Sequence, residues 1–328
     1  MITYSFIGSD KNAGKTTALN YIYRELQQNR QSRSICLSSI GINGEDVDTY
    51  EGVKKPHIDL FPDSCFITNC VHLAHQTGKY ETLLNLGRPL FTKNYIFGRS
   101  LLEMQLVLEG PNSGNEVRNV KRRIAPFLSD DGIFLIDGSI DRQFLAKPEI
   151  SDGFYFSVLF TERPQQFQKS CDFLRMLSLA PCSKQVHRII AKNLETKTKS
   201  LLLTESYRPV YQGEAIISRD RKLRKQCEAI SRTKCFLYLK GALTRSLYEF
   251  LAPFSELQVI LDNFTLYLNI PTSHHQEIEF KPKVVLFHPV PVKTIFIKQE
   301  TDFDLSLLPP EVLARNLFRT LLQKSCHK

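Results

Sequence analysis

The stretch GSDKNAGKTT at residues 8–17 combines glycines, a lysine and hydroxyl side chains at a spacing suited to binding phosphate. It follows an apolar run at residues 2–7 that predicts a buried strand, and residues 15–28 predict a helix. A glycine-containing turn between a strand and a helix directs backbone amides and the positive helix end at a phosphate group. We therefore predict a nucleotide site at this turn.

Each residue type in this loop has a chemical role. Lys15 would contact the β and γ phosphates of ATP as a catalytic residue, and the Thr16 hydroxyl would bind Mg²⁺. Gly14 would let the backbone approach the phosphates without a Cβ clash. The alternative is a chance tight turn in which Lys15 only faces solvent. The expected nucleotide-binding residues are Gly8, Asn12, Ala13, Gly14, Lys15, Thr16 and Thr17.

Acidic residues close to apolar runs are candidates for holding the metal. Asp137 ends the run IFLID, Glu109 lies in the run LVLEG, and a polar loop carries Glu45, Asp46 and Asp48. Mg²⁺ prefers oxygen ligands, and the carboxyl ends of parallel strands meet at one edge of a sheet. For each acid alone, a solvated turn is the alternative. The expected metal ligands are Thr16, Asp48, Glu109 and Asp137, and Asp137 is also expected to be catalytic.

Expected strands and helices alternate along the first part of the chain. The strands are expected at 2–7, 34–40, 133–137 and 154–160, and the helices at 15–28, 115–128 and 164–179. This alternation favours an α/β fold, a P-loop NTPase-like parallel sheet flanked by helices.

The pattern changes near residue 205, which predicts a P-loop nucleotide-binding domain at 1–205 and a smaller C-terminal α/β unit at 206–328. The elements expected in that unit are strands at 235–239, 257–261, 283–288 and 293–298, a helix at 244–251, and an amphipathic helix from about Pro310.

The formal net charge of +9 fits an anionic partner such as nucleotide, nucleic acid or an acidic protein surface, and the alternative is that the basic charge only aids solubility. The sequence contains neither a long basic block nor a basic stripe interleaved with aromatic residues, so it does not favour a nucleic-acid-binding protein. The basic segment 118–123 suits either a partner contact or a solvated helix face.

Neither a secretory signal nor an uncharged stretch of roughly 18 residues is present, so no membrane association is expected. The eight cysteines suit a reducing compartment, and we expect a cytoplasmic protein.

The spacing of the loop glycines is unusual, because five residues rather than four separate Gly8 from Gly14. The loop GSDKNAGKT resembles that of dethiobiotin synthetase, which has the same spacing. That enzyme belongs to the phosphate-loop class related to nitrogenase iron protein and signal-recognition GTPases, so the extra residue is compatible with nucleotide binding.

Four separated stretches support a second resemblance: KNAGKTTALN (11–20), SSIGINGEDVDTYEGVKKP (38–56), LIDGSIDRQFLAKPEISDGF (135–154) and LYLKGALT (237–244). Together they resemble the phosphate-loop subunit of the reactivating factor of adenosylcobalamin-dependent lysine 5,6-aminomutase and ornithine aminomutase. The chain departs from this pattern at Ile42 and Asn43, where an arginine and an aspartate are expected, and its loop is one residue longer. A carboxylate role there would therefore fall to Glu45 or Asp48.

The resemblance implies a subunit that binds and hydrolyses ATP with Mg²⁺ and, with a MutS-like ATPase subunit, releases damaged cobalamin from an adenosylcobalamin-dependent amino acid aminomutase. Residues 41–56 would form the loop that senses the γ-phosphate. Two alternatives stay open. One is a dethiobiotin synthetase-like ATP-dependent small-molecule enzyme, supported by the loop and by Glu109-Gly110. The other is a non-hydrolysing nucleotide-binding scaffold, supported by the substitution at Asn43.

Overall fold

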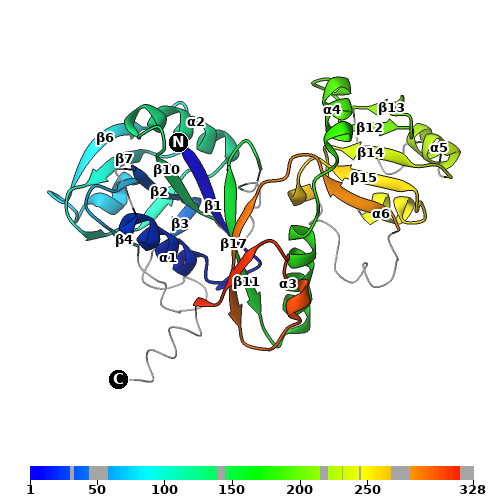
Figure 1. Cartoon of the computed structure of the whole chain (residues 1–328). Helices are drawn as coiled ribbons and strands as arrows, with labels where there is room; N and C mark the ends of the chain where they lie inside the picture. Colours follow the sequence, from blue (N-terminus) through cyan, green and yellow to red (C-terminus); the bar gives the residue numbers. More distant parts are fainter. Residues whose placement is uncertain are drawn as a thin grey trace. The chain divides into compact units, whose positions relative to one another are not determined.

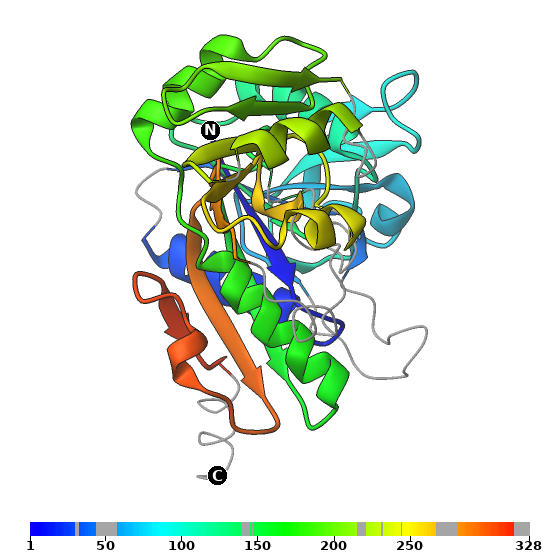
Figure 2. The same cartoon turned by 90° about the vertical axis from the view of Figure 1, so that its right-hand side faces the viewer.

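The computed structural model describes residues 1–29, 33–43, 58–138, 145, 147–214, 221–230, 232–243, 245–266 and 281–317. The chain divides into two compact units, drawn in Figures 1 and 2. Unit 1 comprises the described parts of Met1–Ser170, Val290–Phe303 and Pro310–Lys328, and unit 2 comprises those of Cys171–Pro289 and Asp304–Pro309.

Unit 1 is built on a nine-stranded sheet with the order β18-β17-β11-β1-β10-β2-β5-β7-β6. Its strands are β1 (Ile2–Gly8), β2 (Ile35–Ser39), β5 (Cys65–Asn69), β6 (Tyr80–Leu86), β7 (Tyr95–Ser100), β10 (Ile133–Asp137), β11 (Gly153–Phe160), β17 (Val292–Gln299) and β18 (Leu313–Arg315). All neighbours from β18 to β5 are parallel, whereas β7 pairs antiparallel with β5 and with β6. The mostly parallel α/β sheet expected from the sequence is confirmed, with an antiparallel edge that was not anticipated.

Two short ribbons accompany the large sheet. β3 (Gly41–Asn43) pairs antiparallel with β9 (Leu108–Gly110), and β4 (Asp59–Leu60) pairs with β8 (Met104–Gln105). The β3–β9 ribbon follows directly from the carboxyl end of β2. It therefore extends the edge of the sheet at which the expected acids lie.

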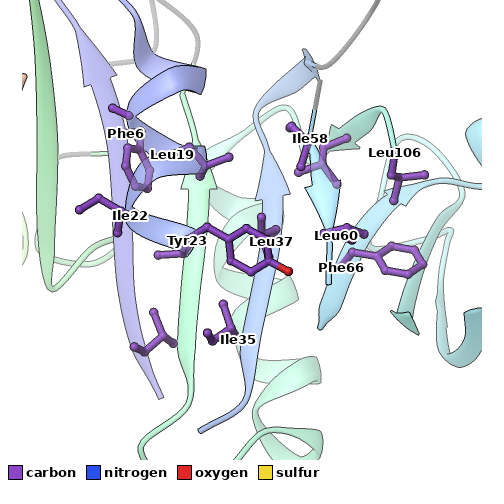
Figure 3. Packing of buried hydrophobic residues seen from close by; sticks show 14 of the residues in the cluster. Phe6, Leu19, Ile22, Tyr23, Ile35, Leu37, Ile58, Leu60, Phe66 and Leu106 are labelled. Atoms are coloured by element: carbon purple, nitrogen blue, oxygen red, sulfur yellow. The ribbon is translucent and has the colours of Figure 1, made fainter. Parts of the chain in front are cut away.

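Helices cover both faces of the large sheet. α1 (Lys15–Gln28) buries Ala18, Leu19, Ile22 and Tyr23, a spacing that places all four on one side of the helix. Figure 3 shows Leu19, Ile22 and Tyr23 packed on strand residues such as Phe6. Since strand side chains alternate between faces, the remaining strand residues meet the opposite layer. There α2 (Gly114–Ile124) buries its own apolar side, and α3 (Pro164–Leu177) follows β11.

β1 is the strand at which the strand order of the large sheet reverses. The chain runs from β1 to β2 and β10 on one side, and later to β11 and β17 on the other. In open α/β sheets, ligands bind outside the carboxyl ends of the strands where the strand order reverses in this way. The loop that follows β1 lies at that point.

Unit 2 is a second α/β layer structure with the sheet order β13-β12-β14-β15-β16. Its strands are β12 (Ser200–Leu203), β13 (Pro209–Gly213), β14 (Cys235–Leu239), β15 (Leu257–Leu261) and β16 (Lys283–Leu286), and its helices are α4 (Lys184–Asn193), α5 (Arg221–Ile230) and α6 (Arg245–Leu251). β14, β15 and β16 are parallel, and β12 is antiparallel to both neighbours.

One face of this second sheet packs against α4, which buries Val186 and Ile190 over Leu201, Phe236 and Ile260. The alternate strand residues face the other side. There α5 and α6 bury Leu223, Cys227, Leu247 and Leu251.

The division of the chain differs from the boundary at residue 205 expected from the sequence. It falls within α3, after Ser170, and the chain returns to unit 1 at Val290. The reason is that β17, expected in the C-terminal unit, pairs along its length with β11 of the large sheet. The amphipathic helix expected from Pro310 is wrong for the described residues, because Leu313–Arg315 forms β18.

Among the helices described, none combines the length and the apolar character needed to cross a bilayer. The seven cysteines in this part of the chain are free thiols.

Candidate phosphate-binding site

The loop between β1 and α1 contains two residues in the left-handed region of backbone conformation. Asn12 and Gly14 both have positive φ values, 56° and 88°. Alternation of this kind turns successive backbone amides toward one point. Gly14 is the N-cap residue of α1 and has no side chain, so the first backbone amides of the helix donate no hydrogen bond to a capping side chain. Ala13 is fully buried, whereas Asn12 is exposed.

Lys15 lies back across this loop. Its Nζ donates a hydrogen bond to the carbonyl oxygen of Asp10, 3.0 Å away. A Cβ at Gly8 would lie 2.9 Å from Lys15 Cγ, so the glycine provides the space that the lysine stem fills. The ammonium group is therefore held over the loop, where a phosphate oxygen could replace the carbonyl as its acceptor.

The Thr16 hydroxyl connects the loop to the neighbouring strand. Thr16 Oγ1 donates to Asp137 Oδ2 at 2.9 Å, and Asp137 is fully buried at the carboxyl end of β10. The parallel pairing of β1 with β10 sets this contact, because Phe6 lies opposite Asp137. The structure thus brings together two side chains expected as metal ligands that are 121 residues apart in the sequence.

The loop is anchored on its other side by β11 and β17. Ser9 N donates to the Ser157 carbonyl oxygen at 2.9 Å, and Ser9 Oγ accepts from Leu159 N at 3.0 Å. Lys298 Nζ, on β17, donates to the carbonyl oxygen of Asn12 at 3.0 Å. No pattern in the sequence connects this lysine with the loop, because 286 residues separate it from Asn12.

A cavity of about 890 Å³ adjoins the loop. Residues 10–12 form one wall, and the turn after β11, the first turns of α3 and Glu300 form the others. The lining is mainly polar and includes Arg163 and Lys169, the second of which lies 3.6 Å from a carboxylate oxygen of Asp10. This volume is within the range of cavities that hold small molecules. None of the lining residues outside the loop was singled out from the sequence.

Glu109 is engaged by two basic side chains. It lies on β9 with its side chain 4% exposed, and Oε2 is 2.8 Å from His72 Nε2 while Oε1 accepts from Lys93 Nζ. Burial, the largest single influence, raises the pKa of Glu109. The hydrogen bonds from Lys93 and His72, the charge of Lys93 and a hydrogen bond from Asn69 together outweigh burial and lower that pKa. Glu109 is therefore an ionised carboxylate held within unit 1.

The other expected site residues make no contact described above or lie outside the described residues. Thr17 lies partly exposed in the first turn of α1. Asp48 lies outside the described residues, as do Glu45 and Asp46. Among the residues that are described, no three His, Cys, Asp or Glu side chains converge as a metal site. A hydroxyl and one carboxylate nevertheless fit Mg²⁺, which commonly keeps water and substrate phosphate as its other ligands.

Comparisons of the chain with protein families, with curated proteins and with solved structures find no match.

Proposed function

We propose that unit 1 binds Mg-ATP at the loop between β1 and α1. The observation that carries this proposal is the hydrogen bond from Thr16 Oγ1 to Asp137 Oδ2, 2.9 Å long, at the start of α1. A hydroxyl and a carboxylate brought together beside a phosphate-binding loop are the two protein ligands by which Mg²⁺ is held in P-loop NTPases. The bound ion would neutralise charge on the β and γ phosphates.

The remaining contacts suggest how the chain orients the nucleotide. The inward amides around Gly14 and the Nζ of Lys15 would hold the phosphates, since both are hydrogen-bond donors at the same turn. The adjoining cavity would take the nucleoside, because it begins at loop residues 10–12 and has the volume for a base and ribose. Lys15 would also stabilise the charge that develops when the γ-phosphate is cleaved.

At the level of the whole protein, we propose an ATP-hydrolysing subunit of a reactivating factor that releases damaged cobalamin from an adenosylcobalamin-dependent amino acid aminomutase. The support is the resemblance at four separated stretches, two of which contain the loop and Asp137. Release of a tightly bound cofactor requires coupling to a step that strongly favours one conformation, and nucleotide hydrolysis supplies such a step.

The first experiment tests nucleotide binding alone. Calorimetric titration with ATP, with and without Mg²⁺, should give a complex that is tighter with the metal. Equal affinity under both conditions, or heat changes indistinguishable from dilution, would contradict the proposed site.

The second experiment tests the function of the whole protein. The chain and a MutS-like ATPase subunit are mixed with an aminomutase inactivated by hydroxocobalamin, and cobalamin release is followed on a desalting column. Release and restored turnover should require ATP and Mg²⁺, and a non-hydrolysable analogue should not support repeated rescue. ATP consumption without cobalamin release would instead favour the dethiobiotin synthetase-like enzyme, and binding without consumption would favour the scaffold.

A further inference from the structure

The first helix of unit 2 after β13 carries a dense group of cations. Within residues 221–234 the sequence has six lysines and arginines and a single acid, Glu228. All six cations are exposed in the structure. They are Arg221, Lys222, Arg224, Lys225, Arg232 and Lys234.

The four cations on α5 occupy a short length of helix. Residues 221–225 span about 6 Å along the axis at 1.5 Å per residue. They lie at the start of the helix, where the backbone dipole is itself positive, and the first turn of α5 contains no acid. Leu223 and Cys227, four positions apart, are buried on one side of the helix, so the cations point outward on the other side. The start of α5 therefore carries a concentrated positive charge, and the acids on the two helices of this face are Glu228 on α5 and Glu249 on α6.

The fold places aromatic rings beside these cations. Arg224 lies over the ring of Phe250 on α6, with Cζ 4.6 Å from the ring centroid. Phe250 in turn meets Phe254 edge-on, with centroids 5.5 Å apart. Both rings are partly exposed. This row of an arginine and two aromatic rings is absent from the linear sequence, because 26 positions separate Arg224 from Phe250.

We infer that the α5–α6 face of unit 2, defined by the cations of α5 with Phe250 and Phe254, binds single-stranded nucleic acid. Cations that neutralise backbone phosphates, together with rings on which bases stack, are the combination by which proteins hold single strands. Arginine suits this role because its planar group pairs with phosphate and stacks on rings. The linear sequence alone does not favour nucleic acid, because Arg224 and the two aromatic rings come together only in the fold.

The test measures the binding of a fluorescein-labelled 20-nucleotide single strand to the full chain by anisotropy. If three cations contact phosphates, the affinity should fall about 20-fold between 50 and 200 mM salt. The triple variant R221E/R224E/K225E should bind more than tenfold more weakly and lose most of this salt dependence. Phe250→Leu should weaken binding about fivefold or more, because a stacking surface is lost while the buried volume is nearly kept.

A matched control separates this face from the total charge of the protein. The variant K184E/R188E/K192E changes the same number of exposed charges on α4, which covers the opposite side of the same sheet. It should bind the strand within about threefold of the unmodified protein. Circular dichroism should show that both triple variants are folded.

Several results would overturn the inference. The inference would be wrong if the single strand did not bind at 50 mM salt, or if the α4 and α5 variants lost the same affinity for it. It would also be wrong if a duplex bound more tightly than the single strand. Displacement of the strand by polyglutamate as effectively as by unlabelled strand would point instead to an acidic protein partner.

Discussion

The substitution Asp137→Asn separates a metal-binding role for this side chain from a structural one. Asp137 is fully buried and accepts a 2.9 Å hydrogen bond from Thr16 Oγ1. An asparagine has nearly the same shape, and its amide oxygen can accept the same hydrogen bond. It also removes a charge from a buried position, so the variant should fold with its thermal midpoint within a few degrees of the original.

The expected loss is confined to the part of ATP binding that depends on Mg²⁺. Changes to carboxylates that hold or orient a metal commonly cost about 10–100-fold in metal affinity, or about 1.4–2.7 kcal/mol. The affinity for ATP in the presence of EDTA should be unchanged, because the loop amides and Lys15 are intact. Mg-dependent hydrolysis should fall at least in the same proportion.

The assay is calorimetric titration of ATP with Mg²⁺ and with EDTA, repeated for two substitutions of the hydrogen-bond partner. Thr16→Ser keeps the hydroxyl and should behave as the unmodified protein, whereas Thr16→Val should lose the Mg²⁺ effect. The double variant of Asp137→Asn with Thr16→Val should lose less than the sum of the single losses, because both act on one ion. An unchanged Mg²⁺ effect in folded Asp137→Asn would refute the reasoning.

Three further predictions concern other parts of unit 1. Lys15→Ala should weaken ATP binding roughly tenfold or more, since a charge-assisted contact contributes about 1.5–3 kcal/mol, whereas Arg122→Ala on the exposed side of α2 should not change the calorimetric affinity. Glu109→Gln should lower the free energy of unfolding at pH 7 by about 1–3 kcal/mol. The pKa of Glu109 in the folded protein lies below its ordinary value of 4.5. The difference in unfolding free energy between the unmodified protein and Glu109→Gln should therefore be complete above pH 4.5 and disappear as the pH falls through the folded pKa. Urea unfolding that gave equal differences at pH 7 and pH 3 would contradict this prediction. Gly110→Ala should destabilise the protein by about 1–3 kcal/mol, because the new Cβ would lie 2.1 Å from the Ser39 carbonyl oxygen, whereas Gly78→Asn, at an open position with positive φ, should be tolerated. As the chain has no tryptophan, circular dichroism is the suitable probe of unfolding.

The centre of the candidate site could be predicted from the sequence because its signals are local. The order of apolar run, glycine turn and helix defines β1, the loop and α1 within 28 residues. Asp137 could be proposed because it ends an apolar strand, and the strand order then brings it to Thr16. Because strand pairing fixes where the end of a strand lies, the short run IFLID was sufficient to propose Asp137.

The surroundings of the site depend on contacts between distant segments. His72 and Lys93 carry no pattern of their own, and only the β5–β7–β9 region brings them to Glu109. The same holds for Lys298, whose strand reads as an ordinary apolar run that could belong to either sheet. The boundary expected at residue 205 followed from the change in composition, whereas strand pairing assigns β17 to the first sheet.

The place of β17 has a consequence for how the protein is made. Ribosomes deliver the chain from its amino terminus, so β1, β10 and β11 emerge long before residues 292–299. Until then β11 lacks its outer neighbour, Asn12 lacks the hydrogen bond from Lys298, and the cavity lacks Glu300. A chain that ended within unit 2 would therefore expose the edge of β11 and would lack the hydrogen bond from Lys298 to the loop after β1. If the proposed site binds nucleotide, that ability should therefore appear only after residues 292–300 have been synthesised and have paired with β11.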